Sequence, residues 1–376
     1  MGSRQPDKYF VTALLILSGF GLLMVFSASM YTSSVESSNG LSLFLKQAFF
    51  VVLGIFVMWL VSRKNYRRWN NFRLACTLLI VTILLLAAVL VVGMEVNGAK
   101  RWISLGFMTF QPSEFAKFTG VLYLSTVISQ KPEVKKRFSK YTLYCIVPML
   151  VICVLAAIEP SLSAAMAIGV AMLFVMFFGG IPFRFFLPYI AVMGAGIGAL
   201  LIKEPWRMER LNVFFGQNGL NYQISQSLLA IGSGGIFGRG LGNGKQKLLF
   251  LPELQNDFIF ANIGEECGLI GCVLLLVLFG YILYRGFKIA NSSKDEFGYL
   301  YTSSVIALLG FQVIVNIGVA TSIMPVTGMA LPFISAGGTS MVILFMMVGP
   351  IVNLSRGMHS GKRRRSGRQR TKRGQK

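Results

Sequence analysis

One carboxylate in this chain occupies a position where it could take part in acid–base chemistry. Asp257 lies at the end of a long polar loop and at the start of an apolar segment. Holding a charged carboxylate at the mouth of a membrane helix costs free energy, so a functional role is expected for it. The chain has only two other aspartates, Asp7 and Asp295, and its single histidine, His359, adjoins the basic C-terminal tail. A histidine general base or a histidine metal site is therefore not expected.

Basic residues accompany Asp257 on the side of the membrane where the topology below places it. The first group lies around the loop 95–111 and comprises Lys100, Arg101 and Lys117. The second group lies in the loop 203–257 and includes Arg207, Arg210, Lys245 and Lys247. The other loops on this side carry almost no positive charge, so these cations run against the general charge bias. Binding an anion is the simplest task that they could serve.

The segment that begins at Gln111 has the pattern of a helix start. Pro112 suits the first helical turn, and Glu114 suits the positive end of the helix dipole. Glu114 and Lys117 are three residues apart and can pair on one helix face. An ammonium group inside a span needs such a partner or a polar cavity.

The residues around Asp257 allow more than one interpretation. The glycine-rich run Gly238–Lys247 resembles phosphate-binding loops in composition but lacks their fixed spacing, so it could equally be a flexible hinge. Asp257 could simply cap the helix that follows it. Small residues on the same predicted helix face would admit a close neighbour: Ala261, Gly264, Gly268 and Gly271. Glu265 and Glu266 lie deeper and need internal partners.

The elements that must position these residues are membrane helices. Hydrophobic residues make up 54% of the chain and charged residues 13%, and apolar runs of spanning length recur. No cleavable signal peptide is expected, because the first apolar run continues for a full span. The sequence therefore predicts an all-α integral membrane protein with ten transmembrane helices, at about 10–30, 44–62, 73–94, 112–129, 141–158, 162–178, 184–202, 258–284, 299–323 and 334–354.

The distribution of lysine and arginine predicts the orientation. Basic residues concentrate at both termini and in the loops around residues 63–68, 131–137, 184 and 285–294. This set is cytoplasmic by the positive-inside rule, so both termini are inside and Asp257 is the only aspartate outside. The predicted organisation is a membrane domain, residues 1–357, with a large outer loop, 203–257, before the eighth span, followed by a basic tail, 358–376.

The tail explains much of the net charge of +22. Residues 361–376 contain nine basic residues and no acid. Such a run next to a final span is predicted to be disordered and to contact anionic lipid, an interpretation that we favour over nucleic-acid binding. The five cysteines, all in or beside apolar runs, indicate packing residues and neither disulfides nor a metal site.

Several motifs together resemble the SEDS family (shape, elongation, division and sporulation), which includes FtsW, RodA and SpoVE. They are Asn97–Trp102, Gln111–Glu114 with Lys117, Tyr222–Gln223, Gln226–Ser227, Gly240–Gly242, Gln246–Lys247, Leu251–Glu253, Asp257–Ala261, Pro325–Gly328 and Leu331–Phe333. The short link from Gly240 to Lys247 is similar to the division and sporulation branch. Three features depart from the family pattern, one of which is a short stretch between Arg210 and Tyr222. Residues 159–163 read Glu-Pro-Ser-Leu-Ser where Gln-Pro-Asp-Leu-Gly is usual, and Ala336 replaces an aromatic residue.

The resemblance implies a peptidoglycan glycosyltransferase of the bacterial cytoplasmic membrane. It would polymerise lipid II at the outer face and release undecaprenyl diphosphate. A sugar hydroxyl needs one general base, for which Asp257 is the candidate. A diphosphate leaving group needs only cationic stabilisation. The candidates for substrate binding are Arg101, Lys117, Arg207 and Arg210, followed by Lys100, Lys245, Lys247, Glu114 and Gln111.

The resemblance also implies a partner, a class B penicillin-binding protein with transpeptidase activity. No ligand cluster demands a metal, but a divalent cation (Mg²⁺ or Mn²⁺) bridging Asp257 and a diphosphate stays open. Two other function classes remain: a lipid II flippase and a non-catalytic scaffold for the penicillin-binding protein. Against a flippase, the charges gather at the outer face and few lie at the midplane. Against a scaffold, recruitment alone does not require Asp257 or the outer cations.

Overall fold

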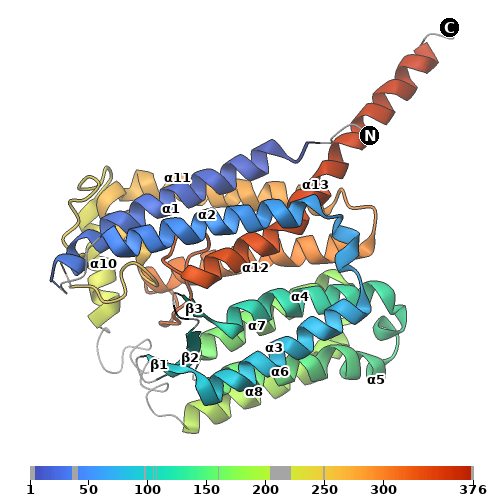
Figure 1. Cartoon of the computed structure of the whole chain (residues 1–376), viewed down its shortest axis with the longest axis horizontal. Coiled ribbons are helices and arrows are strands. Elements are labelled where there is room, and N and C mark those ends of the chain that lie inside the picture. Colours follow the sequence, from blue (N-terminus) through green and yellow to red (C-terminus); the bar gives the residue numbers. More distant parts are fainter. Residues whose placement is uncertain are drawn as a thin grey trace.

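Most of the chain is helical (Figure 1). The computed structural model describes residues 5–35, 41–96, 99–104, 106, 108–159, 161–203, 222–248 and 250–373. The helices are α1 (Lys8–Val35), α2 (Leu41–Arg63), α3 (Phe72–Val92), α4 (Pro112–Gln130), α5 (Phe138–Tyr141), α6 (Val147–Ile158), α7 (Leu162–Phe178), α8 (Phe186–Lys203), α10 (Tyr222–Gly234), α11 (Ile259–Ala290), α12 (Glu296–Ala320) and α13 (Gly338–Arg373). A π-helical turn, Thr142–Ile146, joins α5 to α6, and single 3₁₀ turns lie at Tyr66–Trp69, Pro132–Lys135 and Phe183–Phe185.

Each range in which the sequence predicts a span contains helix. Seven helices of the described segments are long and apolar enough to cross a membrane: α1, α2, α3, the continuous segment Phe138–Ile158, α11, α12 and the first part of α13, Gly338–Gly357. Helices α7 and α8 are shorter apolar helices. Helix α4 is less apolar but is buried on nearly all sides, so protein surrounds most of its surface. Helix α13 continues through the basic tail to Arg373, where the composition predicted disorder.

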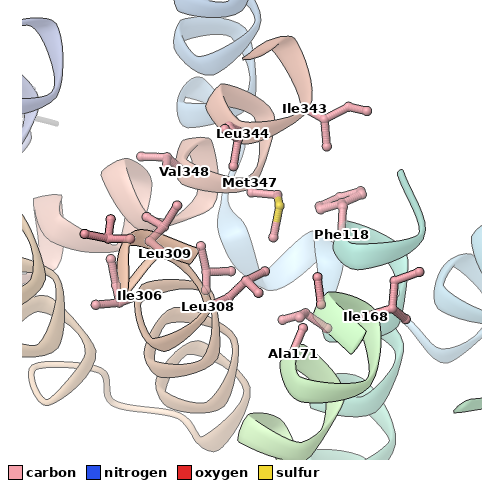
Figure 2. Close-up of a cluster of buried hydrophobic side chains, with 14 of the residues drawn as sticks. Phe118, Ile168, Ala171, Ile306, Leu308, Leu309, Ile343, Leu344, Met347 and Val348 are labelled. Carbon is pink, nitrogen blue, oxygen red and sulfur yellow. The ribbon is translucent and has the colours of Figure 1, made fainter. Parts of the chain in front are cut away.

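The helices form two groups that meet along α12 (Figure 1). One group contains α3, α4, α6 and α7, and the other contains α1, α2, α10, α11 and α13. Helix α12 packs against α4 and α7 on one side and against α11 and α13 on the other. Figure 2 shows this junction as a cluster of buried apolar side chains, including Phe118, Ile168, Leu308 and Met347. Its apolar packing holds the two groups together.

A small β-sheet interrupts the predicted all-α architecture. Strands β1 (Met94–Val96), β2 (Ala99–Ser104) and β3 (Thr109–Phe110) pair antiparallel in the order β1-β2-β3. The sheet lies between α3 and α4, at the end of the molecule that also carries α10 and opposite to both termini (Figure 1). The segment was predicted as an outer loop, because strands this short leave little periodic signal. The pairing fixes β2, and with it Arg101, against the helix ends.

Helix α11 breaks at Gly268, and the glycine-rich segment before it fills the gap. Gly268 has φ 65° and ψ −166°, a backbone conformation that residues other than glycine rarely adopt. The backbone N–H of Leu269 donates to Gly235 O (2.9 Å), and the N–H of Gly240 donates to Glu266 O (3.0 Å). A break in a membrane helix is tolerated when protein groups satisfy its freed backbone atoms in this way.

The close approach predicted for the small-residue face of α11 is confirmed at Gly264 and Gly268. A Cβ atom on Gly234 would overlap the backbone of Gly264, and a Cβ atom on Gly268 would overlap the backbone of Gly238. Helix α10 and the loop after it therefore approach α11 as closely as backbone permits. This packing holds the segment that leads to Asp257 against the helix bundle.

Candidate active site

A cavity of about 1290 Å³ lies at the end of the molecule that carries the β-sheet. Strand β2, the start of α4, the start of α7, the loop before α11 and the loop between α12 and α13 line it. It brings together five of the predicted site residues, which come from two distant parts of the chain, residues 101–117 and residue 257: Arg101, Gln111, Glu114, Lys117 and Asp257. The loop 325–337, which contains two prolines and three glycines, lines the same cavity, and irregular backbone at membrane depth is tolerated at such a place.

Glu114 and Lys117 form the ion pair that their spacing predicted. The Nζ atom of Lys117 lies 2.7 Å from Oε1 of Glu114. The side chains are only 5% (Lys117) and 16% (Glu114) exposed, because α4 is surrounded by other helices. Charges sheltered from water interact more strongly than surface charges. Lys117 is thus a cation in the cavity wall that Glu114 holds in one place.

Arg101 reaches the cavity from β2 and contacts the turn after α6. Its Nε–H donates to the backbone oxygen of Glu159 over 3.3 Å. The side chain of Glu159 is fully buried, and neither carboxyl oxygen has a hydrogen-bond partner among the described residues. Burial raises the pKa of the Glu159 carboxyl to about 8, although the nearby Arg101 acts to lower it. Glu159 is therefore mostly neutral at pH 7.

Asp257 lies where two loops meet. Its backbone N–H donates to Glu253 O (3.2 Å), and its backbone oxygen accepts from Nδ2 of Asn316 on α12 (2.8 Å). The same Nδ2 donates to Met329 O (2.7 Å), so Asn316 joins the loop before α11 to the loop after α12. Gly328 has φ +71°, and a Cβ atom there would lie 3.3 Å from Oδ2 of Asp257. A glycine thus allows the second loop to pass close to the carboxylate.

The capping role predicted for Asp257 is wrong. The N-cap position of α11 is Phe258, and no side chain caps this helix. The loop before α11 ends in a turn whose hydrogen bonds to Glu253 O place Asp257 one residue too early to cap. Instead, the carboxylate belongs to the cavity wall.

Two uncharged polar groups of the cavity wall were missed by the sequence analysis. The Oε1 atom of Gln312 on α12 and the Oγ1 atom of Thr327 are buried, and no described residue hydrogen-bonds to either. Buried polar groups normally have partners, so both are suited to contact a polar ligand. The sequence signal was a glutamine inside an apolar helix.

The glycine-rich loop binds carboxylates, but these are side chains of the same protein. The backbone N–H groups of Lys245 and Gln246 donate to Glu265 over 2.7 and 3.1 Å. Glu266 accepts from Ser27 Oγ (2.6 Å) and lies 3.4 Å from Nζ of Lys247. The prediction that Glu265 and Glu266 have internal partners is confirmed. Lys245 and Lys247 do not line the cavity.

The other cations that were predicted to bind substrate lie either outside the cavity lining or outside the described residues. Lys100 is exposed on β2, next to Arg101 in the chain but outside the cavity lining. Arg207 and Arg210 lie outside the described residues. The cationic part of the cavity that the structure describes is therefore made by Arg101 and Lys117.

Comparison with known proteins identifies the family. A model of the FtsW/RodA/SpoVE family, described as cell cycle protein, matches residues 7–360. The chain belongs to this family. The resemblance inferred from the motifs is thereby confirmed, and relatives in the division and sporulation branch match over most of their length.

Two curated relatives are similar in sequence to this chain. A probable peptidoglycan glycosyltransferase FtsW of Coxiella burnetii is 37% identical, over 94% of this chain and 97% of the relative. The stage V sporulation protein E of Bacillus subtilis is 34% identical, over 94% and 97%.

Solved structures agree with the fold of this family member. The Thermus thermophilus rod shape determining protein RodA matches with a TM-score of 0.69 and 31% identity, over 93% of this chain and 97% of RodA. A chain from a peptidoglycan synthase complex, studied for the coordination of polymerization and crosslinking, matches with a TM-score of 0.76 and 28% identity, over 94% and 98%. Each likeness covers more than nine tenths of this chain.

In this FtsW/RodA/SpoVE family member, the described cavity residues could hold a divalent cation only together with a bound ligand. Among the described residues, no group of three or more histidine, cysteine, aspartate or glutamate side chains could hold a metal ion. The carboxylates of Asp257 and Glu114 both line the cavity, and Glu114 forms an ion pair with Lys117. Mg²⁺ is commonly bound by one or two carboxylates together with substrate phosphates, and Asp257 alone could supply the protein share.

Proposed function

We propose that the chain is a peptidoglycan glycosyltransferase that polymerises lipid II and releases undecaprenyl diphosphate. The observation that carries the proposal is the cavity in which Asp257 shares a wall with Arg101 and Lys117. This combination is suited to transfer from a diphosphate-linked sugar, because a carboxylate can accept a hydroxyl proton while cations stabilise the departing diphosphate. The names of the curated relatives support the same reaction.

In this mechanism each side chain has a separate task. Asp257 removes the proton from the attacking sugar hydroxyl as the new glycosidic bond forms. Arg101 and Lys117 bind the diphosphate and stabilise the negative charge that develops as its bond to the donor sugar breaks. Glu114 fixes the position of Lys117, and Gln111, at the entrance of α4, contacts the substrate. Arg207 and Arg210 remain proposed diphosphate ligands.

A divalent cation would be held between Asp257 and the diphosphate. When bound there, Mg²⁺ or Mn²⁺ would neutralise part of the diphosphate charge. Asp257 would then orient the ion, and Arg101 and Lys117 would still bind the diphosphate oxygens.

We infer ten membrane spans with both termini in the cytoplasm of a bacterial cell. The seven long apolar helices, the two shorter ones and the buried helix α4 make up these spans. Both termini lie at one end of the molecule and the β-sheet at the other, as an even number of crossings requires (Figure 1). Because the basic loops lie at the end of the termini, the cavity faces outward. Lipid II would then reach it from the outer leaflet of the cytoplasmic membrane.

A class B penicillin-binding protein is the proposed partner. It is supported by the similarity to a chain of a peptidoglycan synthase complex that coordinates polymerization with crosslinking. The basic tail would contact anionic lipid rather than nucleic acid.

The deciding experiment measures glycan polymerisation by purified protein in vesicles that contain lipid II, with and without the partner. We expect Asp257→Ala and Asp257→Asn to lose polymerisation by at least a hundredfold, the order of a general-base contribution. The control is Glu95→Gln, which removes an exposed carboxylate of the sheet outside the cavity and should polymerise normally.

Three outcomes would contradict the proposal. Normal polymerisation by Asp257→Ala would remove the catalytic role of Asp257. A wild-type protein that moves lipid II across vesicles without making polymer would be a flippase. In cells, complementation by Asp257→Asn would indicate a scaffold, since recruitment alone tolerates that near-isosteric change.

A further inference from the structure

The side chain of Gln312 presents an unpartnered polar group to the cavity. Gln312 belongs to α12, lines the cavity and is only 6% exposed. Its Oε1 atom is buried, and no described residue donates a hydrogen bond to it. Leaving a buried acceptor unpaired costs free energy, and polar side chains inside membrane helices are costly for the same reason. A partner that comes from a bound ligand would remove this cost.

Gln312 lies one helical turn from the residue that holds Asp257. Asn316, four positions further along α12, donates from Nδ2 to the backbone oxygens of Asp257 (2.8 Å) and Met329 (2.7 Å). Residues four positions apart lie on one helix face, about 5.4 Å apart along the axis. The amide of Asn316 therefore holds the protein loops around Asp257, and the amide of Gln312 is left to a ligand close to that carboxylate.

An unpaired acceptor oxygen restricts which part of the proposed substrate can bind to it. The oxygens of an ionised diphosphate are acceptors too, so they are repelled by the Oε1 atom of Gln312. A prenyl chain has no hydrogen-bond donor. The sugar does carry donors, which are its hydroxyl groups and the N–H of an acetamido group. Gln312 is therefore suited to the sugar and not to the diphosphate or the lipid.

The surrounding cavity wall favours the acetamido group over a hydroxyl group. Buried apolar side chains line the same cavity: Phe258, Met329, Leu331 and Leu344. The Oγ1 atom of Thr327, also in the cavity wall, has no partner among the described residues and can donate as well as accept. An acetamido group combines an N–H donor, a carbonyl acceptor and an apolar methyl group. It can thus use the Gln312 oxygen, the Thr327 hydroxyl and the apolar wall, whereas a sugar hydroxyl has no apolar part.

We propose that Gln312 is a specificity-determining residue that accepts a hydrogen bond from the acetamido N–H of a lipid-linked sugar. The cavity then selects 2-acetamido sugars over sugars with a hydroxyl group at that carbon. The inference rests on the proposed function, because it takes the N-acetylated sugars of lipid II as the substrate. The acetamido group is bonded to the carbon next to the one that bears the diphosphate, which fits a contact one helical turn from the residue that holds Asp257.

The experiment compares two synthetic probes that differ only in this group. They are farnesyl diphosphate esterified with N-acetylglucosamine and farnesyl diphosphate esterified with glucose. Calorimetric titration of the full-length protein in detergent gives the two affinities. We expect the wild type to bind the N-acetylglucosamine probe on the order of tenfold more tightly, since the glucose probe leaves the buried acceptor unpaired. Gln312→Leu should bind both probes with nearly equal affinity. Farnesyl diphosphate itself, which has no sugar, should bind equally to both proteins.

Thermal unfolding without ligand separates a ligand contact from a structural role. Leucine needs no hydrogen-bond partner, so ligand-free Gln312→Leu should melt at or above the temperature of the wild type. Asn316→Leu, which removes two hydrogen bonds from the next turn of the same helix face, should melt below it. A Gln312→Leu protein that melts clearly below the wild type, or that does not fold, would show that the glutamine supports the fold and would overturn the proposal.

A matched control lies on the same helix. Ser304 is fully buried and its Oγ atom has no partner among the described residues, but it does not line the cavity. Ser304→Ala should therefore keep the wild-type preference for the N-acetylglucosamine probe. An equal preference in wild type and Gln312→Leu would overturn the proposal. A wild-type protein that does not distinguish the two probes would overturn it as well, and that result needs no variant.

The same samples, given lipid II, test the proposed function separately. Polymerisation that depends on Asp257, in a protein that does not distinguish the two probes, would remove only the role of Gln312. A preference for the N-acetylglucosamine probe that depends on Gln312, in a protein that makes no polymer, would support the role of Gln312 in sugar binding and remove the glycosyltransferase.

Discussion

The buried pair Glu114–Lys117 allows a structural role to be separated from a functional one. The two charges are 2.7 Å apart and almost fully sheltered from water. With an effective dielectric constant of about 20, their attraction is roughly 6 kcal/mol before desolvation is subtracted. Removing one partner of a buried pair typically costs about 3–5 kcal/mol, because the other charge is left uncompensated. We therefore expect Glu114→Gln and Lys117→Met each to lower the free energy of unfolding by about this amount.

The double variant Glu114→Gln/Lys117→Met should behave differently in the two assays. With no buried charge left, its free energy of unfolding should return to within about 1–2 kcal/mol of the wild type, because neutral replacement of a buried pair is often tolerated. Polymerisation should stay as slow as in Lys117→Met, on the order of a hundredfold or more below wild type, since the cation is still missing. Thermal unfolding in detergent and polymer yield from lipid II measure the two quantities on one preparation.

A pair outside the cavity provides the control. Lys140 and Glu133 also form an ion pair, but their side chains are 38% and 60% exposed. Loss of such a surface pair should cost less than about 1 kcal/mol, so Glu133→Gln should unfold and polymerise almost as the wild type does. The reasoning is refuted if the double variant polymerises at the wild-type rate, or if it remains as unstable as the less stable single variant.

Three further predictions concern other residues. The pKa of the Glu159 carboxyl is about 8 in the folded protein and near 4.5 when unfolded, so the folded state holds an extra proton between these values and loses stability as the pH rises through that window. Glu159→Gln should therefore raise the melting temperature at pH 7, by an equivalent of about 1–3 kcal/mol in the free energy of unfolding. The variant should also lack the decline in stability that the wild type shows between pH 5 and 8. Identical dependence of the melting temperature on pH in the two proteins would contradict this prediction. Asn316→Leu removes the two hydrogen bonds that join Asp257 to the loop after α12, so polymerisation should slow mainly through kcat, with KM nearly unchanged, whereas an effect on KM alone would argue against a positioning role. Gly268→Ala should prevent accumulation of folded protein, because of the positive φ and the adjacent backbone, while Gly280→Ala on the same helix meets open space and should accumulate normally in a fluorescence size-exclusion assay.

The membrane helices and the candidate residues could be predicted from the sequence because both depend on local properties. An apolar run of spanning length must satisfy its own backbone hydrogen bonds, so composition alone predicts helix. The spacing of Glu114 and Lys117 on one helix likewise predicts their pairing. Asp257 was recognisable as unusual, since a carboxylate between a polar loop and an apolar run is costly.

The role of the glycine-rich loop could not be predicted because it depends on a distant partner. Its composition is suited to anion binding, and the loop does bind anions, but these are Glu265 and Glu266. Only the close approach of this loop to α11 determines that the anion is internal. The β-sheet was missed for a related reason, since its strands are held by pairing with one another and not by their own periodicity.

The sequence by itself determined that this chain is a helical membrane protein of the FtsW/RodA/SpoVE type, with one aspartate and several cations available for chemistry. The tertiary structure decided which of them meet. Arg101, Lys117 and Asp257 come from β2, α4 and the loop before α11, and only the packing of both helix groups around α12 brings them to one cavity. The tertiary structure also decided that Glu159 is buried next to Arg101. Lys100, which precedes Arg101 in the sequence, is exposed. Convergence and burial are properties of long-range packing, and no local pattern encodes them.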